Sequence, residues 1–323
     1  MIKVSVIIPV YGVESSIERC ARSLMEQTLL DIEFIFVNDC TKDSSIGILE
    51  RVINEYKSRE GHVKIVHHSS NKGLPQARKT GLLHARGEFI AHCDSDDWVD
   101  PDLYEKLYYS AFYNDSDIAV CDFLVHRENE AGLRLGARTN DVNTYIQNLL
   151  FQKDSVAMWN KLIRRDIYAN DILFPFDNMG EDMATTLQLV AHCHKMSFVE
   201  GAYYHYDGTT NSITREVSKE KVLTRAIQAC RNVNLAIRFY QDSESEIIRN
   251  GITHLKFMQR RQLMPIINHQ DAYEIWKRTF PEINLDVLFK RAVQISVWDR
   301  LKFFMTLIGL FPIIKECFRS NLK

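Results

Sequence analysis

The sequence lacks an excess of charge of one sign, a paired-cysteine motif and a long apolar run. Its 323 residues carry a formal net charge of -2, which gives no electrostatic reason to expect nucleic acid as a partner. The seven cysteines lie far apart and include no C-x-x-C pair. This spacing argues against a zinc ribbon or a disulfide framework and favours reduced thiols in the cytoplasm. No segment is long enough to cross a bilayer as a helix, and the N-terminus has no small-residue cleavage site.

Glycine-rich phosphate-binding loops are also absent. Neither G-x-G-x-x-G nor G-x-x-x-x-G-K-[ST] occurs in the chain. A chain of this length can form one large core and a smaller appended region, and its 46% hydrophobic and 25% charged residues are typical of a soluble globular protein. Any nucleotide phosphate bound here would therefore need positive charge from another source, such as a metal ion.

Strand and helix patterns alternate through the first third of the chain. We expect strands at residues 4–10, 32–37, 63–67, 88–93 and 117–121, and helices at 14–26, 45–56, 74–85 and 101–112. Near-continuous apolar strands separated by helices predict an α/β fold with a mostly parallel sheet covered on both faces. Beyond residue 216 the pattern becomes helical, with long helices expected at 222–240 and 246–263. We therefore predict a first domain at residues 1–215 and a helical C-terminal region at 216–323.

The fourth expected strand ends in three carboxylates within four residues, Asp94, Asp96 and Asp97. A fold seldom crowds like charges for stability, because each carboxylate makes it harder to ionise the next. A divalent cation resolves this conflict, since hard oxygen ligands suit Mg²⁺ or Mn²⁺. A solvated acidic turn is the alternative for an isolated D-x-D. Polar clusters also follow the first two strands, and ligands of such sheets bind beyond the carboxyl ends of the strands.

Several segments resemble, in order and spacing, the family 2 glycosyltransferases of the GT-A (Rossmann-like) fold. They are VSVIIPVY at 4–11, EFIFVNDCTKDS at 33–44, NKGLPQARKTG at 71–81, ARGEFI at 85–90, DSDD at 94–97, WNKL at 159–162, GED at 180–182, YYHY at 203–206 and NSIT at 211–214. The resemblance covers residues 3–215 and implies an inverting transfer of a hexose from a nucleotide-diphosphate sugar, most often a UDP-sugar. The implied acceptor is a hydroxyl of a growing surface glycan, with a polyprenyl-diphosphate-linked glycan as one form.

The resemblance also implies residue roles. Asp182 matches the catalytic base. A Mn²⁺ or Mg²⁺ ion is expected on Asp96 and Asp94, and the acceptor side should include Trp159, Lys161 and Glu181. The residues expected to bind the donor are Pro9, Tyr11, Glu14, Asp39, Arg78, Asp94, Ser95, Asp97 and His205. Without the resemblance, Asp182 would equally suit a helix N-terminus, where acidic residues interact favourably with the helix dipole.

The chain departs from the family pattern at a few positions. Cys40 stands where glycine is usual, Gly12 where asparagine is common, Asn38 where a second aspartate is frequent and Lys79 where asparagine is usual. These changes lie beside the expected nucleobase and phosphate sites. The nature of the donor is therefore less firmly implied than the type of reaction.

Residues 303–314 form an almost entirely apolar segment flanked by Arg300, Lys302, Lys315 and Arg319. Such a segment suits the interface of an anionic membrane, and it suits equally a terminal helix docked on the protein's own core. We therefore expect a cytoplasmic protein, with the inner face of the membrane as an alternative location. The rival functions are a sugar nucleotidyltransferase, which would want a basic glycine-rich loop after the first strand, and a catalytically silent nucleotide-sugar binding protein.

Overall fold

A computed structural model describes residues 1–127, 130–209, 218–269 and 271–311. Its strands are β1 (Val4–Val10), β2 (Ile32–Asn38), β3 (Val63–His67), β4 (Phe89–His92), β5 (Trp98–Val99), β6 (Ile118–Arg127), β7 (Glu130–Arg134), β8 (Lys161–Arg164) and β9 (Met196–Asp207). Its helices are α1 (Ile17–Met25), α2 (Ser45–Glu55), α3 (Leu74–His84), α4 (Leu103–Tyr113), α5 (Val142–Leu150), α6 (Glu181–Val190), α7 (Lys219–Ala236), α8 (Glu246–Arg261), α9 (Ala272–Arg278), α10 (Asn284–Phe289) and α11 (Val297–Leu307).

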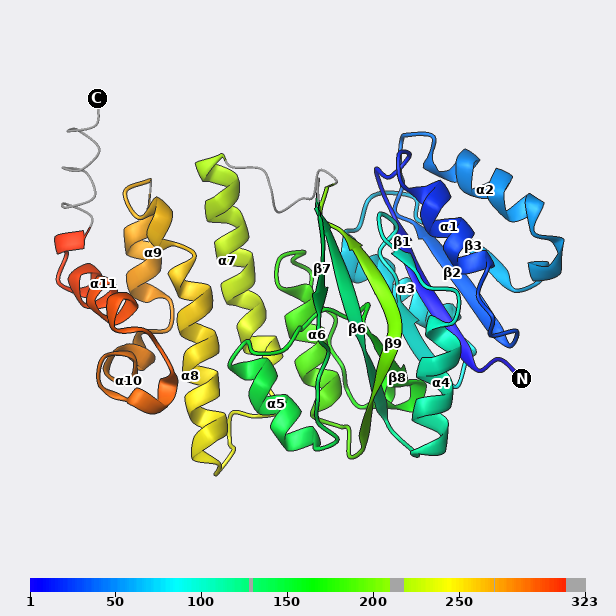
Figure 1. Cartoon of the computed structure of the whole chain (residues 1–323). Helices are drawn as coiled ribbons and strands as arrows, with labels where there is room; N and C mark the ends of the chain where they lie inside the picture. The colour runs from blue at the N-terminus through cyan, green and yellow to red at the C-terminus, as the bar shows by residue number, and fades with distance from the viewer. Residues whose placement is uncertain (128–129, 210–217, 270, 312–323) are drawn as a thin grey trace.

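The described strands form one sheet in the order β3-β2-β1-β4-β8-β6-β9-β5, with β7 paired to β6 (Figure 1). The first four strands are parallel, so their carboxyl ends meet at one edge. The predicted α/β fold is confirmed. Strands β5, β7, β8 and β9 were not predicted, and β8 enters the sheet antiparallel between β4 and β6.

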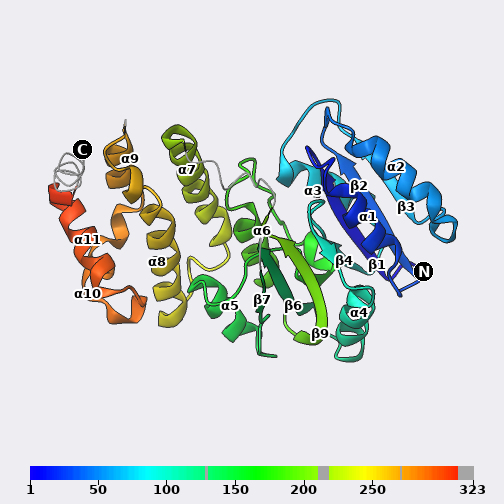
Figure 2. The ribbon, with the colours of Figure 1, turned by 45° about the horizontal axis from the view of Figure 1, so that its top comes forward.

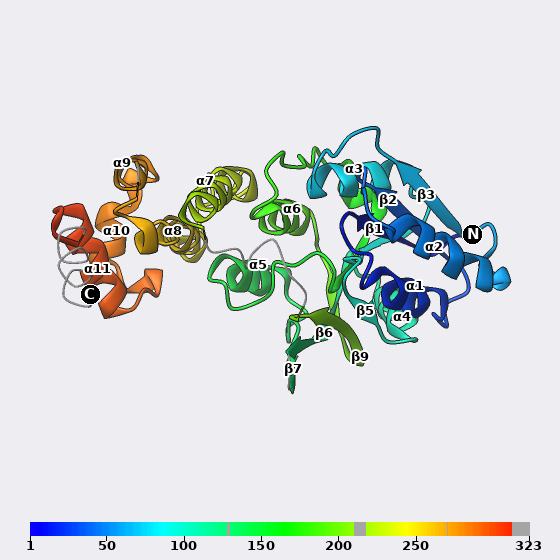
Figure 3. The ribbon, with the colours of Figure 1, turned by 90° about the horizontal axis from the view of Figure 1, so that it is seen from above.

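Side chains of β1 and β2 alternate between two cores, one on each face of the sheet. Val6 and Phe34 belong to a core shared with α1, α2 and α4, whereas Ile7 and Ile35 face the side of α3. Every residue of both strands is buried, which explains their near-continuous apolar sequence. Figure 3, seen from above, shows α1 and α3 on opposite sides of these strands.

The C-terminal helices α7 to α11 extend the molecule away from the sheet, and Figures 1 and 2 show them side by side. Val233 and Tyr240, in and just after α7, share a core with Leu187 of α6. The predicted boundary at residue 216 lies outside the described residues, so the division into two domains stays a prediction. Within the described part of the chain, no helix combines the length and apolarity required to cross a bilayer.

Candidate active site

A cavity of about 1220 Å³ opens beyond the carboxyl ends of β1, β2 and β4. It brings together most of the residues that the sequence predicts for the site. The predicted residues that line it are Pro9, Tyr11, Glu14, Asp39, Asp94, Ser95, Asp96, Trp159, Glu181 and Asp182. Parallel strands explain this convergence, since their ends deliver loops from distant parts of the sequence to one edge.

The cavity wall is acidic. Among the described residues that line it there is no lysine, arginine or histidine. Eight carboxylic side chains line it: Glu14, Asp39, Asp43, Asp94, Asp96, Asp154, Glu181 and Asp182. No group of three or more His, Cys, Asp or Glu side chains in the described ranges is arranged to hold a metal by itself.

The acidic turn after β4 is held from below by Tyr204 of β9. The Tyr204 hydroxyl donates to Asp97 Oδ2 at 2.6 Å, and the Asp94 backbone N–H donates to the same hydroxyl at 3.0 Å. Asp97 is fully buried and also accepts the backbone N–H of Asp207. Asp97 therefore supports the turn and does not line the cavity, and its expected role toward the donor remains a prediction. Tyr204 is a residue that the sequence interpretation missed.

Arg19 fixes the outer side of the same turn. Its guanidinium lies 3.7 Å from the ring centroid of Trp98, donates to the backbone carbonyl of Asp96 at 2.9 Å, and pairs with Asp207. Trp98 thus packs beneath the turn, and this ring of contacts orients Asp94 and Asp96 toward the cavity.

Arg78 of α3 is fully buried and contacts three carboxylates. Its Nη2 lies 3.0 Å from Asp94 Oδ1 and 3.4 Å from Asp182 Oδ1, and its Nε lies 3.1 Å from Glu181 Oε1. The guanidinium is enclosed and engaged with these acids, so that Arg78 joins the acidic turn to the start of α6. The expected position of Arg78 beside the nucleotide remains a prediction.

Burial and charge shift the pKa values of this cluster in opposite directions. Burial alone would lower the pKa of Arg78, but the charges of Glu181, Asp94 and Asp182 raise it overall. Burial raises the pKa of Asp94 to about 6 although the Arg78 charge opposes this. Burial likewise raises the pKa of Glu181 well above its usual value, again against Arg78.

Asp182 and Glu181 open α6 after a tight turn at Gly180, whose φ of 77° suits glycine. The Glu181 side chain is only 3% exposed, whereas that of Asp182 is 30% exposed. Of the two carboxylates, Asp182 therefore presents more surface to the cavity. The position of Glu181 beside Arg78 suits a residue that orients its neighbour.

At the other end of the cavity, Asp39 holds the turn that precedes α3. Its Oδ1 accepts the backbone N–H of Lys72 at 2.7 Å and hydrogen bonds with His68, and its Oδ2 accepts the N–H of Gly73 at 2.8 Å. Hydrogen bonds also tie the loops after β1 and β2 together: Glu14 Oε2 accepts the N–H of Ser44, and the N–H of Glu14 donates to Asp43 Oδ2. The predicted contact of Asp39 with a nucleotide remains a prediction.

His205 does not line the cavity, contrary to the prediction that it contacts phosphate or metal. Its Nε2 lies 2.8 Å from Asp100 Oδ1, its Nδ1 lies 2.9 Å from His126 Nε2, and its ring stacks on Trp98. Successive residues of a strand point to opposite faces, so Tyr204 and Tyr206 of β9 differ from His205 in direction. Tyr206 lines the cavity.

Trp159 and Lys161 differ in their relation to the cavity. Trp159 lines it and stacks on Tyr204, with ring centroids 4.3 Å apart. Lys161 is 1% exposed, and its Nζ donates to the carbonyls of Ser155 and Ala157 and to Asn160 Oδ1. Lys161 therefore supports the loop that lines the cavity and does not face an acceptor, which corrects its predicted place.

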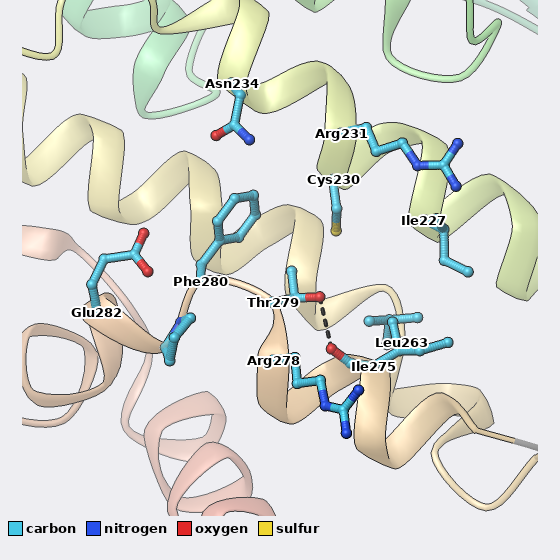
Figure 4. Close-up of a pocket in the computed structure, with 11 residues that line it drawn as sticks. Ile227, Cys230, Arg231, Asn234, Leu263, Ile275, Arg278, Thr279, Phe280 and Glu282 are labelled. Atoms are coloured by element: carbon cyan, nitrogen blue, oxygen red, sulfur yellow. Dashed lines mark hydrogen bonds between the residues drawn. The ribbon is translucent and has the colours of Figure 1, made fainter.

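A second groove of about 450 Å³ lies between α7 and the segment from α9 to Pro281–Ile283 (Figure 4). Cys230 and Arg231 come from α7, and Arg278 and Phe280 face them. Burial raises the pKa of Cys230 to about 12, so its thiol is not a nucleophile at neutral pH. None of the predicted site residues lies in this groove.

Comparison with known proteins agrees with the fold and the cavity. Residues 5–171, just over half of the chain, match the model of "Glycosyl transferase family 2". The chain is 32% identical over 226 residues to the putative glycosyltransferase EpsH of Bacillus subtilis, covering 67% of this chain and 64% of that protein. This chain belongs to glycosyltransferase family 2. It spans somewhat less than two thirds of the length of EpsH.

Two solved structures share the fold. One is TarS residues 1–349 of Staphylococcus aureus in complex with UDP-GlcNAc, with TM-score 0.62, 18% identity, and 99% of this chain and 92% of that chain covered. TarS is a poly(ribitol-phosphate) β-N-acetylglucosaminyltransferase. The other is the mannosyltransferase PcManGT of Pyrobaculum calidifontis with GDP-Man and Mn²⁺, with TM-score 0.57, 14% identity, and 97% and 86% covered. Both neighbours confirm the GT-A fold.

Proposed function

We propose that this chain is an inverting, metal-dependent glycosyltransferase. It moves a hexose from a nucleotide-diphosphate sugar to a hydroxyl of a growing surface glycan, and a UDP-sugar is the donor we favour. One observation carries the proposal: Asp94 and Asp182 contact the same Arg78 guanidinium, at 3.0 and 3.4 Å, at the edge of one cavity. Asp94, one of the two acids proposed to hold the metal, thus lies beside the proposed base. Family membership and the UDP-GlcNAc complex of TarS support a nucleotide-sugar donor.

The donor set suits a hard divalent cation. Asp94 and Asp96 offer carboxylate oxygens in a cavity whose described wall has no cation to meet a diphosphate. Mg²⁺ and Mn²⁺ are often held by one or two carboxylates together with substrate phosphates, so two acids are enough. Bound there, the ion would supply Lewis-acid stabilisation of the charge that develops on the departing diphosphate. The Mn²⁺ complex of the archaeal mannosyltransferase supports this choice of metal.

The exposure of Asp182 and the burial of Glu181 assign different roles to these two carboxylates. Asp182 takes the proton of the acceptor hydroxyl as its oxygen bonds to the anomeric carbon. The bond from that carbon to the diphosphate breaks, and the nucleoside diphosphate leaves with the electron pair. Glu181 is buried against Arg78, so it is poorly placed to attack the sugar as a nucleophile. With Asp94 and Asp96 assigned to the metal and Glu181 buried, Asp182 is the carboxylate assigned to the acceptor, and a single displacement with inversion fits this assignment better than two steps with retention.

The test is a panel of nucleotide sugars with Mn²⁺ or Mg²⁺, assayed for nucleotide binding and for release of nucleoside diphosphate with and without glycan acceptors. Asp96→Asn should abolish metal-dependent UDP binding. Asp182→Asn should keep UDP binding and reduce turnover by roughly 10²–10⁴-fold, as expected for a lost general base. The matched control is Asp102→Asn, at an exposed aspartate outside the cavity, which should change neither property. Binding of UDP with no transfer to any glycan would favour a silent binding protein, and release of pyrophosphate from a sugar phosphate and UTP would favour a nucleotidyltransferase.

We also propose that the C-terminal region contacts the inner face of the membrane. Val297, Leu301, Phe304 and Ile308 recur at helical spacing along α11 and are each at least 43% exposed, and Trp298 beside them is 73% exposed. Phe303 of the same helix is buried in the C-terminal core. One face of α11 therefore packs on the protein, and the apolar residues of another face are exposed. Apolar stripes with nearby basic residues such as Lys302 bind anionic lipid surfaces.

Sedimentation with vesicles of anionic and of neutral lipid tests this location. Leu301→Glu should release the protein from anionic vesicles, whereas Leu83→Glu, at an exposed leucine of α3, should leave binding intact. Equal behaviour of the two variants would contradict the proposed membrane face.

A further inference from the structure

The cavity has more room than a donor alone requires. Ligand sites of proteins have volumes of roughly 300–1,000 Å³, and this cavity has about 1220 Å³. The loop after α5 and the end of α8 form part of its wall. A second substrate therefore has room in the cavity that contains Asp182.

Three amide side chains line this wall, Gln152, Gln259 and Gln262, together with the carboxyl group of Asp154, and we call these four residues the amide wall. Gln152 follows α5 in the left-handed conformation, with φ of 53°. On α8 the two glutamines are linked, because the Gln262 amide N–H₂ donates to the side-chain oxygen of Gln259. None of these four residues was selected by the sequence interpretation.

Helix packing brings the amide wall to the catalytic end of the cavity. A Cβ built on Gly180 would lie 3.4 Å from the Cα of Ala229, so α7 touches the turn directly before α6. Ala229 lines the cavity together with Gln259, and α7 packs along α8. The amide wall and Asp182 therefore line the same cavity.

The chemistry of the amide wall suits hydroxyl groups. Each amide offers two donors and an acceptor, which match the alternating donors and acceptors of a sugar ring. The described wall offers no cation to a phosphate: Arg78 is enclosed by carboxylates, and Lys161 donates to the carbonyls of Ser155 and Ala157. A negatively charged acceptor would meet like charge without compensation, whereas a neutral sugar would not.

We infer that the amide wall is the acceptor site and that its ligand is the uncharged, hydroxyl-bearing end of a carbohydrate. The inference rests on the proposed function. It places the chain after the step that attaches the first sugar to a phosphate carrier, because the acceptor must already present a sugar. It also separates this chain from a transferase that acts on a phosphodiester polymer.

The test compares three acceptors with the donor and metal found in the nucleotide-sugar panel: a neutral oligosaccharide mixture, a poly(ribitol phosphate) fragment and undecaprenyl phosphate in detergent. Only the neutral oligosaccharides should raise the release of nucleoside diphosphate above donor hydrolysis. A higher kcat/KM with either phosphate acceptor would overturn the inference. So would the absence of any response to neutral oligosaccharides while donor hydrolysis proceeds.

A double variant tests the residues themselves. Gln152→Leu with Gln262→Leu removes two exposed amides and should raise the KM for the neutral acceptor by about tenfold or more, since each lost hydrogen bond contributes severalfold. The affinity for UDP should stay the same. The matched control is Gln241→Leu with Gln294→Leu, two exposed glutamines outside the cavity, of which Gln294 has a similar φ of 57°.

The outcomes separate the two proposals. An unchanged acceptor KM in the Gln152→Leu and Gln262→Leu variant would overturn the acceptor site, as would loss of UDP affinity in it. Failure of the wild-type protein to bind any nucleotide sugar would instead remove the proposed function on which the inference rests.

Discussion

Arg78 Nη2 lies 3.0 Å from Asp94 Oδ1 and has no exposed surface. The same nitrogen lies 3.4 Å from Asp182 Oδ1, so one buried cation connects the acidic turn after β4 with the first turn of α6. Removing either the guanidinium or one of its carboxylate partners would leave a buried charge unpaired, which costs free energy of folding. The relative placement of the two proposed functional acids thus depends on α3, which carries neither of them.

Replacing Arg78 tests this connection. Arg78→Met would leave three carboxylates crowded in a buried site and should lower the free energy of unfolding by about 3–5 kcal/mol. Arg78→Lys keeps the charge but cannot contact three acids with a rigid fork, so it should recover stability only in part and should lower kcat. Urea unfolding and steady-state kinetics measure the two effects.

The control is Arg51→Met, because Arg51 forms a surface ion pair with Glu18 in which both side chains are more than 40% exposed. Its stability should hardly change. If Arg78→Met unfolded at the same urea concentration as Arg51→Met, the guanidinium would have no special role.

Tyr204 offers a test of the acidic turn without touching an acid. Tyr204→Phe deletes the hydroxyl that joins Asp97 to the Asp94 backbone and leaves the buried Asp97 carboxylate short of a donor. The free energy of unfolding should fall by about 1–3 kcal/mol. Metal-dependent UDP affinity, measured by calorimetry, should fall as well, because the turn is less well fixed. Tyr108→Phe, at another largely buried tyrosine, should leave UDP affinity unchanged; equal UDP affinity in both variants would refute the role of Tyr204.

Local sequence patterns predicted the elements that bury both faces of the sheet. The bounds of β1 and β3 agree with the expected residues 4–10 and 63–67, because a bend with polar or glycine residues follows each strand and ends it. The position of β8 could not be predicted in the same way. Its pairing with β4 joins residues more than seventy positions apart. The local pattern of apolar residues predicts that a segment forms a strand but not which distant strand it pairs with.

The same limit applies to the surroundings of single side chains at the site. From its local sequence, Arg78 is a basic residue that follows a turn. The residues that enclose it, Glu181 and Asp182 at the start of α6, lie about one hundred positions later in the chain. In the YYHY segment at 203–206, His205 was predicted to contact the phosphate. The alternation of β9 turns His205 toward Asp100 and gives the neighbouring Tyr204 the position below the acidic turn.

Cys40 illustrates a departure from the family pattern with a measurable consequence. Its φ is 59°, in the left-handed region, and glycine is the residue that the family usually has here. A non-glycine residue in this conformation costs roughly 1–2 kcal/mol, from which the greater flexibility of unfolded glycine subtracts about 0.5–1 kcal/mol. Cys40→Gly should therefore raise the free energy of unfolding by up to about 1.5 kcal/mol. Chemical denaturation checks this, with Cys40→Ala as the control that removes the thiol but keeps the strain; equal stability of the two variants would show that the backbone is not strained.

Lys161 connects stability with pH. Burial lowers the pKa of its ammonium group to about 8, although the charges of Asp154 and Asp182 oppose this. Below pH 8 the group is charged in both the folded and the unfolded chain. As the pH rises through 8, the folded protein releases the proton, while the unfolded chain keeps it up to the ordinary value near 10.5.

Because the unfolded state then binds more protons, the free energy of unfolding contributed by Lys161 should rise between pH 8 and 10. Lys161→Met lacks the titrating group, so the stability of the wild-type protein relative to this variant should grow across that interval. The variant should also be less stable at pH 7, since three oxygen acceptors at Ser155, Ala157 and Asn160 lose their shared donor. Urea unfolding of both proteins at pH 7, 8, 9 and 10 measures the difference, and a difference that stayed constant over this range would show that the buried ammonium keeps its proton in the folded protein.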